Sequence, residues 1–531
     1  MAADVTKVFR RFQAAKADRE RHEPHWRDCY LYTHPMRSDG LLGREYDAVI
    51  AARELADMLD STATDSADTL AANFQSGMTP ANARWFALDS GDESDEERQW
   101  FDMAADVCWQ NIHNSNFDAE AFEGCLDLID AGWFVLYVDE DRERGGLAFE
   151  QWPIGQCYLA STRSDGAIDT VFRKWKLPAI AVVEEFGEAC SEQVRKLAEK
   201  KPDDLVELLR VIEPRKVYAT NARMAKNLRV ASCTYEVKTK TLLRESGYHE
   251  MPCIVPRWQK LPGSCYATGP VSGVLGNARM LNKLMACQLD AADIAISGMW
   301  LAVDDGVLNP NTIKIGPKKV VVAAEKDSLV PLQTGANFNL SFELIDRLQS
   351  AIRKGLMADQ LQPQDKANMT ATEVSVRVAM IRQLLGPRYG RMQAEYLRPL
   401  VERVFGLAFR AGALGMPPQS LANRNFDVRY ISPLARAQKQ EDVNAMDRYE
   451  LSLYQQAQMD PSAMDGYKWD KARAKRAELL GVPAELVATE DELAEIRAQR
   501  QEAQQEQQAG MVQQQAAMSA ADSVGKRMMG G

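Results

Sequence analysis

Apolar residues recur three and four positions apart along much of the first 131 residues, which is the spacing of one buried helix face. This pattern predicts helices over residues 4–32, 49–76, about 97–115 and about 117–131. From Gly132 the pattern changes to short apolar runs rich in β-branched and aromatic side chains, with Gly145-Gly146 as a hairpin turn. Two short helices, at about 179–187 and 190–200, interrupt the predicted strands. Residues 1–265 therefore predict an α+β unit with an antiparallel sheet.

Two long helices dominate the next part of the chain. We expect one from about Gly273 to Ser297 and another over about 338–358, separated by a segment with NP and GP turns and short strand-like runs. The second helix carries apolar residues at a regular three-to-four spacing, at Phe338, Phe342, Ile345, Leu348, Ile352 and Leu356. These six residues are expected to form its buried stripe.

A polar stretch, Gln360–Ala367, follows the second long helix. Thr370 then stands three residues before Glu373, a capping box that predicts a new helix from about residue 370. We expect Gly386-Pro387 to break or kink this helix, which resumes to about residue 411. Beyond it we expect a strand at 426–432, a polar helical tail from about 435, and a Gln/Ala-rich end that is either disordered or helical beside copies of itself.

The whole chain thus predicts an α+β fold that is mainly α-helical. The two long helices, with a compact segment between them and a polar loop after them, are compatible with two arrangements. They can form a bundle inside one subunit, or each pair can pack against the pair of the next subunit in a ring.

Composition narrows the range of functions. With 531 residues, 46% hydrophobic and 26% charged, the chain can form about three or four packed units. Its net charge of −11 argues against tight non-specific binding of nucleic acid over its whole surface, because such binding requires cations that neutralise phosphates. Nine scattered cysteines without a CxxC pair predict reduced thiols. No apolar run approaches the ~20 residues of a membrane span, so we expect a soluble protein without a membrane partner.

Four side chains of metal-binding types stand close together near the N-terminus: His22, His25, Cys29 and His34. On a helix the first three share a face, and such side chains can bind zinc. Pro24 lies inside the run, however, and no supporting polar pattern accompanies it. An ordinary polar helix face is therefore favoured, and no metal site is predicted.

Sequence motifs for catalysis are lacking. The chain contains no P-loop, no GxSxG and no HExxH. The Gly-rich residues 269–276 lack the strand–turn–helix context of a nucleotide-binding loop, and we interpret them as a flexible start of the first long helix. Asp304-Asp305 stands in a DDG sequence typical of a solvated turn. The sequence predicts a protein that is not an enzyme and has no cofactor.

Four stretches, in order along about 380 residues, resemble the head-to-tail connecting, or portal, proteins of short-tailed double-stranded DNA phages. They are LDSTATDSADTLAANFQSGMTPANARWFAL (59–88), MPCIVPRWQKLPGSCYATGP (251–270), NMTATEVSVR (368–377) with LLGPRYGRMQAEYLRPLVERVF (384–405), and YISPLARAQK (430–439). The four stretches together are specific for this family, although none of them is specific alone.

The resemblance implies a ring, usually of twelve subunits, at one vertex of a phage capsid. A separate terminase would pump genomic DNA through its channel, and the DNA would later leave the same way. The implied partners are further copies of the chain, the major capsid protein and scaffold, terminase, tail adaptor proteins and the passing double-stranded DNA. The implied location is the virion, after synthesis in the cytoplasm of a host bacterium.

The resemblance also implies a division of the chain into named regions. These are a wing over 1–270, stem helices over 271–298 and 338–358, a clip over 299–337, a tunnel loop over 359–369, a further wing part with the kinked helix and strand over 370–432, a crown over 433–500, and a C-terminal barrel helix or disordered tail over 501–531.

A channel must let DNA pass without holding it tightly. Twelve copies would carry 12 × −11 = −132 charges, a field that repels phosphates at long range. Salt screens this field over roughly 8–10 Å, so a few cations can touch phosphates without reading bases. The candidate channel residues are Gln362, Gln364, Asp365, Lys366 and Asn368 in the loop, and Glu343, Arg347, Arg353 and Lys354 on the second stem helix. Glu343, one turn before Arg347, is expected to neutralise it in part. Ordinary solvated residues or intersubunit salt bridges are the alternative for these positions.

Two other classes of protein stay open from the sequence. One is an enzyme of the packaging machinery, against which the missing P-loop and the lack of an acidic metal cluster count. The other is a structural virion protein without a channel, such as a tail adaptor. Ring stoichiometry and an open axial pore would separate these classes from a portal.

Overall fold

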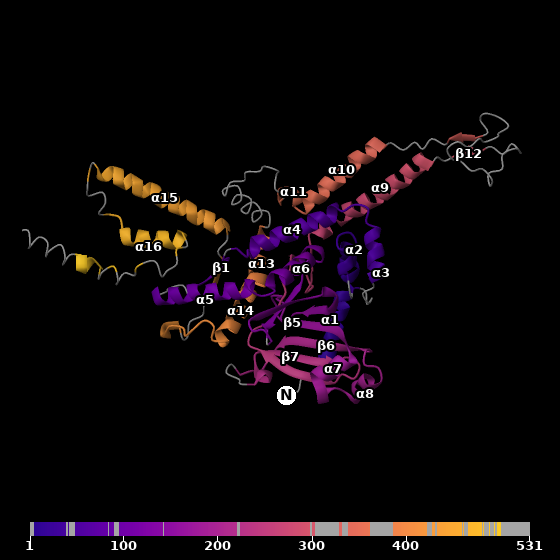
Figure 1. The fold of residues 1–531 in the computed structure, drawn as a ribbon, viewed down its shortest axis with the longest axis horizontal. Coiled ribbons are helices and arrows are strands. Elements are labelled where there is room, and N and C mark those ends of the chain that lie inside the picture. The colour runs from indigo at the N-terminus through magenta and orange to yellow at the C-terminus, as the bar shows by residue number, and fades with distance from the viewer. Residues whose placement is uncertain are drawn as a thin grey trace, which may run out of the picture. The chain divides into compact units, whose positions relative to one another are not determined.

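The computed structural model describes residues 5–500 apart from a number of gaps. The residues outside the description are 1–4, 39–40, 42–47, 83, 90–94, 142, 220–223, 298–299, 303–328, 332–337, 362–385, 422–426, 431–432, 459, 461–465, 481, 483–487, 489–492, 494–495 and 501–531. The chain divides into two compact units (Figure 1). Unit 1 comprises Met1–Trp85 and Val107–Ala413, and unit 2 comprises Phe86–Asp106 and Leu414–Gly531.

The N-terminal half begins with helices, as the apolar spacing predicts. They are α1 (Val5–Glu20), α2 (Glu23–Leu31), α3 (Ala48–Ala56), α4 (Thr62–Met78), α5 (Asp95–His113) and α6 (Phe117–Asp130). The prediction of one helix over 4–32 is wrong, because the chain turns at Arg21 and His22 before α2 begins. Pro24 lies in the first turn of α2, where its missing N–H costs nothing.

A five-stranded antiparallel sheet forms the centre of unit 1. Its strand order is β4-β5-β6-β7-β8, with β4 (Cys157–Ala160), β5 (Thr170–Pro178), β6 (Leu205–Pro214), β7 (Val230–Glu236) and β8 (Leu242–Tyr248). Between β5 and β6 the chain forms α7 (Ala179–Phe186) and α8 (Glu192–Lys200). The antiparallel sheet and both short helices confirm the sequence prediction.

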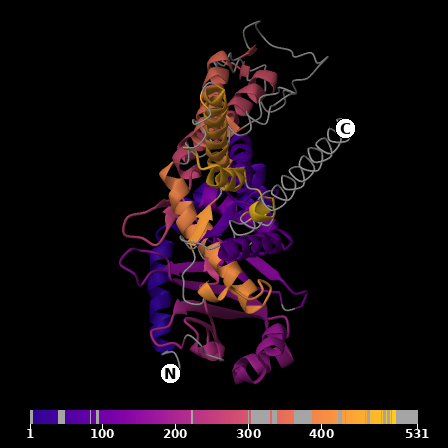
Figure 2. The same cartoon turned by 90° about the vertical axis from the view of Figure 1, so that its left-hand side faces the viewer.

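Helices cover both faces of this sheet. On one face α1 packs its Phe12 into a core with Leu209. On the other face α7 packs its Val182 into a separate core with Leu208. Leu208 and Leu209 belong to different cores because successive side chains of a strand point to opposite faces. Figure 2 shows α1 and the α7–α8 pair on opposite sides of the sheet, so this part of unit 1 has three layers.

A smaller three-stranded sheet has the order β3-β2-β9, with β2 (Val135–Glu140), β3 (Leu147–Trp152) and β9 (Cys253–Ile254). Gly145 and Gly146 turn the chain between β2 and β3 with φ angles of 77° and 93°, which confirms the predicted hairpin. Trp26, Trp133, Trp152 and Tyr266 form an aromatic core with these strands and α2. Burial of each such large side chain contributes about 1.5–3 kcal/mol.

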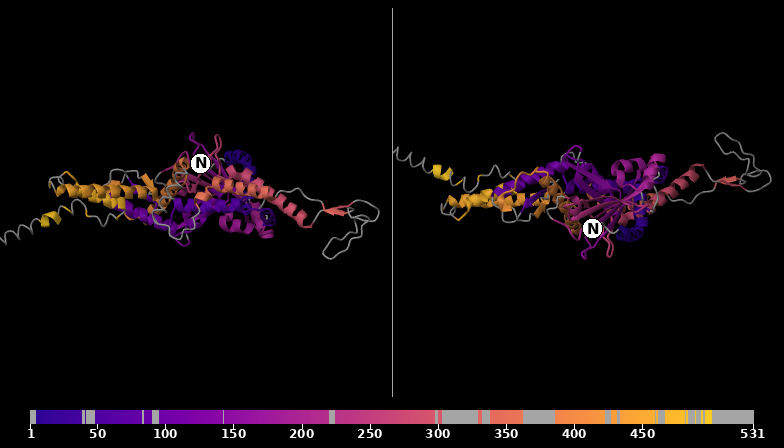
Figure 3. Two further views of the ribbon diagram at one scale, coloured as in Figure 1. Left: turned by 90° about the horizontal axis from the view of Figure 1, so that it is seen from above. Right: turned by 90° about the horizontal axis from the view of Figure 1, so that it is seen from below.

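The long helices that follow are α9 (Val271–Ser297) and α10 (Phe338–Gly355). They run side by side in unit 1 (Figures 1 and 3). The two short strands β12 (Trp300–Ala302) and β13 (Leu329–Pro331) pair antiparallel in the segment that connects them. Strands β10 (Gln259–Lys260) and β11 (Ala267–Thr268) pair just before α9, and α11 (Ala358–Leu361) follows α10.

The helix predicted over residues 370–385 lies outside the described residues. The predicted continuation after Gly386-Pro387 is confirmed at its start, because α13 (Pro387–Met392) begins at the proline, after Gly386 with a φ of 46°. A π-helical turn at Gln393–Leu397 leads into α14 (Arg398–Arg410). The apolar face of α14 is buried, including Val401, Val404 and Ala408.

Unit 2 pairs β1 (Phe86–Asp89) with β14 (Asp427–Tyr430) in an antiparallel ladder. Its long helices are α15 (Pro433–Ala457) and α16 (Trp469–Leu480), which pack against each other. The aromatic rings of Tyr449, Tyr467 and Trp469 are in contact between these helices. The strand predicted at 426–432 and the helical character predicted from about 435 are therefore confirmed where the structure describes them.

Candidate functional site

The helix pair α9–α10 is joined along apolar faces. On α10, Ile345 and Ile352 are buried, and on α9, Val274 and Leu281 are buried. Gly355 allows the closest approach, because a Cβ there would lie only 2.3 Å from Cγ1 of Val274. The apolar stripe predicted for α10 is confirmed at Ile345 and Ile352 and is wrong at one position, since the Phe342 side chain is 55% exposed.

Polar contacts hold the start of α9 to the rest of unit 1. His25 of α2 forms a 2.7 Å hydrogen bond between its Nε2 and the Ser272 hydroxyl. The Arg279 guanidinium lies 2.5 Å from the Asp28 carboxylate. The Asn282 side chain accepts a hydrogen bond from the Leu59 amide at 2.7 Å. These contacts attach α9 both to α2 and to the turn that precedes α4.

The end of α10 is attached to the same turn. The Gln349 amide donates a 2.8 Å hydrogen bond to the Asp60 carboxylate, which also accepts from the Thr62 amide at 2.9 Å. Asp60 therefore caps α4 and contacts α10 at once. The hydrogen bonds and the ion pair therefore attach both α9 and α10 to the rest of unit 1 at the same place, next to α2 and the turn before α4.

Of the four residues of α10 that the sequence singles out, three share one charged face, and Arg353 lies about 100° around the helix from Lys354. Glu343, Arg347 and Lys354 follow one another at four and seven positions, so they share the face opposite Ile345 and Ile352. Glu343 and Arg347 form an ion pair at 2.6 Å, as predicted, with side chains 60% and 73% exposed. Arg353 and Lys354 are exposed, and no carboxylate among the described residues forms an ion pair with either.

The loop candidates Gln362, Gln364, Asp365, Lys366 and Asn368 lie outside the described residues. The structure therefore brings together the four helix candidates and leaves the five loop candidates as predictions. The channel itself would require several copies of the chain and also stays a prediction.

The Gly-rich start of α9 is not flexible, contrary to the interpretation from the sequence. A Cβ at Gly269 would lie 2.1 Å from the Ile129 carbonyl oxygen at the end of α6. Gly132 makes a similar close approach, with a φ of 94° and a would-be Cβ 2.2 Å from the Thr268 carbonyl carbon. Only glycine fits where these two backbones meet, so this junction is tightly packed.

The four side chains of metal-binding types near the N-terminus, His22, His25, Cys29 and His34, do not point towards one common centre. His22 bonds Ser264, His25 bonds Ser272, and His34 bonds carboxylates on two other helices. Burial raises the pKa of the Cys29 thiol to about 12, so Cys29 is not a thiolate at neutral pH. Within the described ranges, no three His, Cys, Asp or Glu side chains gather so that they could hold a metal ion.

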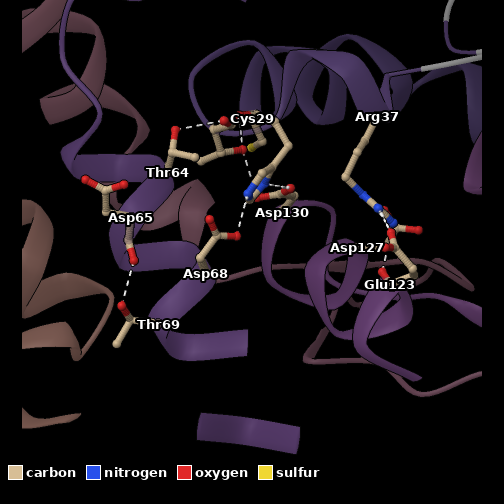
Figure 4. A network of polar contacts seen from close by, with 11 residues as sticks. Cys29, Arg37, Thr64, Asp65, Asp68, Thr69, Glu123, Asp127 and Asp130 are labelled. Atoms are coloured by element: carbon tan, nitrogen blue, oxygen red, sulfur yellow. Dashed lines mark hydrogen bonds and ion pairs between the residues drawn. The ribbon is translucent and has the colours of Figure 1, made fainter. Parts of the chain in front are cut away.

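His34 instead links two helices through charge. Its Nδ1 donates to the buried Asp130 carboxylate of α6 at 2.7 Å, and its Nε2 donates to Asp68 of α4 at 3.0 Å (Figure 4). Burial alone would lower the pKa of His34, but Asp130 and Asp68 outweigh this and raise it to about 10. The imidazole is therefore charged at neutral pH and bridges α4 and α6.

The sequence analysis missed the neighbouring buried network around Asp127 of α6. Its carboxylate accepts from the Tyr30 hydroxyl at 2.8 Å and from the Arg37 guanidinium at 3.1 Å. Burial raises the pKa of Asp127, and the Arg37 charge opposes that rise. The available signal was two acids, Asp127 and Asp130, within the otherwise apolar end of a predicted helix, since unpaired buried carboxylates are costly.

All nine cysteines are free thiols, and seven of them are buried, which confirms the prediction from their scattered positions. Of the helices that the structure describes, none is both long and apolar enough to cross a membrane.

The elements above define a mixed α and β protein that is mainly helical, and comparison with known proteins supplies its family. Residues 5–487 match the family described as bacteriophage head to tail connecting protein, and the chain belongs to this family. It is 27% identical over 506 residues to the probable portal protein of Bordetella phage BPP-1, covering 90% of this chain and 88% of that protein. It is 25% identical over 502 residues to the portal protein of Salmonella phage epsilon15, covering 91% and 89% of the two chains.

Proposed function

We propose that this protein is the portal protein of a phage, a ring at one capsid vertex through which the genome is packaged, retained and ejected. The observation that carries this proposal is the match to the head-to-tail connecting family over residues 5–487. The two portal proteins to which the chain is similar along nine-tenths of its length support it.

The regions of a portal map onto the chain as follows in this proposal. Helices α9 and α10 are the stem, and the connecting segment 299–337, with its small β12–β13 ladder, is the clip. Residues 1–270 and 370–432 are the wing, 359–369 the tunnel loop and 433–500 the crown. The pairing of β1 with β14 adds one detail to this division. It attaches residues 86–89 of the proposed wing to residues 427–430, just before the proposed crown begins.

The charged face of α10 is the proposed DNA-facing surface of the stem, together with the tunnel loop. Its support is the separation of two faces on one helix, with Ile345 and Ile352 buried and Arg353 and Lys354 exposed. Glu343 and Arg347 largely cancel each other at 2.6 Å, so few uncompensated cations would face the DNA. Weak phosphate contacts of this kind suit a surface along which DNA must slide.

Docking of terminase and tail proteins, and contact with the capsid and scaffold proteins, complete the proposed role. No enzymatic step is assigned to the chain in this role. The driving force for packaging would come from the separate terminase, and this ring would be its passive channel.

The test is the native mass of the purified protein, alone and with the capsid and scaffold proteins of its phage, followed by class averages from electron microscopy. Twelve chains of 59.3 kDa give 12 × 59.3 ≈ 712 kDa. We expect a ring near this mass with a central hole. A stable monomer or dimer in the presence of those partners would contradict the proposal and favour a tail adaptor or a packaging enzyme.

A further inference from the structure

Helices α1 and α7, which cover opposite faces of the sheet in unit 1, carry net charges of opposite sign, although Arg19 of α1 is buried and paired with Glu23. Helix α1 contains five basic and two acidic residues, a net charge of +3. Helix α7 and the turn after it, residues 179–189, contain Glu184, Glu185 and Glu188 and no basic residue, a net charge of −3. Because α1 and α7 cover opposite faces of the sheet, these surfaces cannot meet within one copy of the chain.

The outer face of α1 is a basic ridge with small residues at its centre. Val8, Phe12 and Ala15 are buried against the sheet. At about 100° per residue, the opposite side of the helix carries Arg10, Ala14 and Ala17 and continues to Arg21 in the following turn. All four of these residues are exposed.

The outer face of α7 has the complementary arrangement. Ala179 and Val182 are buried, so Ile180 and Glu184 form the outward ridge of α7, and the exposed Glu188 follows in the turn after Gly187. The Ile180 side chain is 45% exposed. An apolar residue beside two carboxylates can contact the alanines and the two arginines of the α1 ridge.

The charged groups of both ridges are available for a partner. Other charges on the same helices are already paired, since Arg11 bonds Glu213, Lys16 lies 3.6 Å from Glu20, and Glu185 lies 3.2 Å from Arg244. In the part of the chain that the structure describes, Arg10, Arg21, Glu184 and Glu188 have no ion-pair partner.

We propose that the outer ridge of α1 in one copy docks on the outer ridge of α7 in the next copy. This inference rests on the proposed ring and names one of its subunit contacts. Two different surfaces meet, so the contact is head-to-tail, and repetition of such a contact about an axis closes a ring. Copies with a net charge of −11 repel one another, which makes a local contact of opposite charges necessary for orientation and register.

The experiment uses two charge-reversed variants of the full chain. The first is Arg10→Glu with Arg21→Glu, which makes both ridges acidic. The second is Glu184→Lys with Glu188→Lys, which makes both ridges basic. For each variant alone, we expect the yield of rings to fall by roughly tenfold or more, because like charges then face each other. An equimolar mixture is expected to form rings of wild-type mass that contain both variants in equal numbers, because every contact then pairs opposite charges.

A cysteine pair provides an independent measurement. In a Cys265→Ser, Cys287→Ser background, which removes the two thiols that are not buried, Ala14→Cys combined with Ile180→Cys is expected to give a ladder of disulfide-linked multimers on mild oxidation of the ring, while each substitution alone gives no ladder. Variants whose far-ultraviolet circular dichroism matches wild type but whose mixture forms no ring would overturn the contact, as would rings formed by either variant alone. If the wild type itself forms no ring with capsid and scaffold proteins present, the proposed function fails and this inference fails with it.

Discussion

At the scale of single residues, His34 makes the stability of unit 1 depend on pH. Its pKa is raised from 6.5 to about 10 by the carboxylates of Asp130 and Asp68, against the effect of burial. A folded-state pKa above the unfolded value means that protonation stabilises the fold. This contribution is complete below about pH 6.5 and is lost as the pH rises towards 10.

The prediction is that His34→Gln removes most of this pH dependence. Wild type is expected to be more stable than the variant by a few kcal/mol near pH 6 and to lose that advantage progressively up to pH 10. Thermal unfolding of both proteins across this range measures the difference. If the unfolding temperatures of the two proteins changed with pH in the same way, the charge of His34 would contribute nothing to the link between α4 and α6.

Residue-level reasoning from the sequence singled out His34 and interpreted it as part of an ordinary polar helix face, without finding its two carboxylate partners. Spacing along α2 placed His22, His25 and Cys29 on one face, yet their partners lie more than 240 residues away for the two histidines, at Ser264 and Ser272. Local sequence carries no information on such distant partners. The same limit hid the network of Tyr30, Arg37 and Asp127, which joins side chains from separate helices.

At the scale of elements, the packing of α9 against α10 depends on a glycine. Gly355 ends α10, and a Cβ there would meet the Val274 side chain at 2.3 Å. Alanine in place of a helical glycine usually stabilises by about 0.5–1 kcal/mol. Gly355→Ala is expected to do the opposite and cost about 1–3 kcal/mol, because α9 and α10 must move apart.

The matched control is Gly276→Ala in α9, where a Cβ would meet nothing within 4 Å. We expect this variant to unfold at the wild-type temperature or slightly above it, while Gly355→Ala unfolds several degrees lower. Differential scanning calorimetry of the two variants makes the comparison. Equal behaviour of the two glycine variants would mean that the close approach of α10 to α9 does not limit stability.

Elements with a strong apolar period were predictable from the sequence, and long-range pairings were not. The spacing of Ile345 and Ile352 located α10, and Gly386-Pro387 located the start of α13. The ladder between β1 and β14 joins residues 86–89 to 427–430, and each strand alone is only four residues long. The exposure of Phe342 shows a second limit, because period alone cannot tell a face buried within one chain from a face left for a neighbouring chain.

At the scale of the whole molecule, charge decides how a ring of these chains would treat DNA. The chain carries 75 acidic and 64 basic residues, so twelve copies repel phosphates from a distance. Contact within a channel then depends on the few cations that no carboxylate offsets. On α10 these are Arg353 and Lys354, whereas Arg347 is paired with Glu343 at 2.6 Å.

Reversal of these two charges is expected to impair DNA handling without preventing assembly. Arg353→Glu with Lys354→Glu replaces two exposed residues, Lys354 on the face opposite Ile345 and Ile352 and Arg353 on the flank of the helix, so rings of wild-type mass should still form. Each ring would lose twelve pairs of phosphate contacts, and we expect DNA-filled particles to fall by roughly tenfold or more in a phage supplied only with this variant. The control Glu343→Gln with Arg347→Gln removes both members of the ion pair and leaves the net charge unchanged, so it should package DNA nearly as wild type does. Normal genome content with the double variant would place the DNA-facing surface of the stem elsewhere than on this face of α10, whereas a loss of ring mass would mean that Arg353 and Lys354 serve contacts between subunits instead.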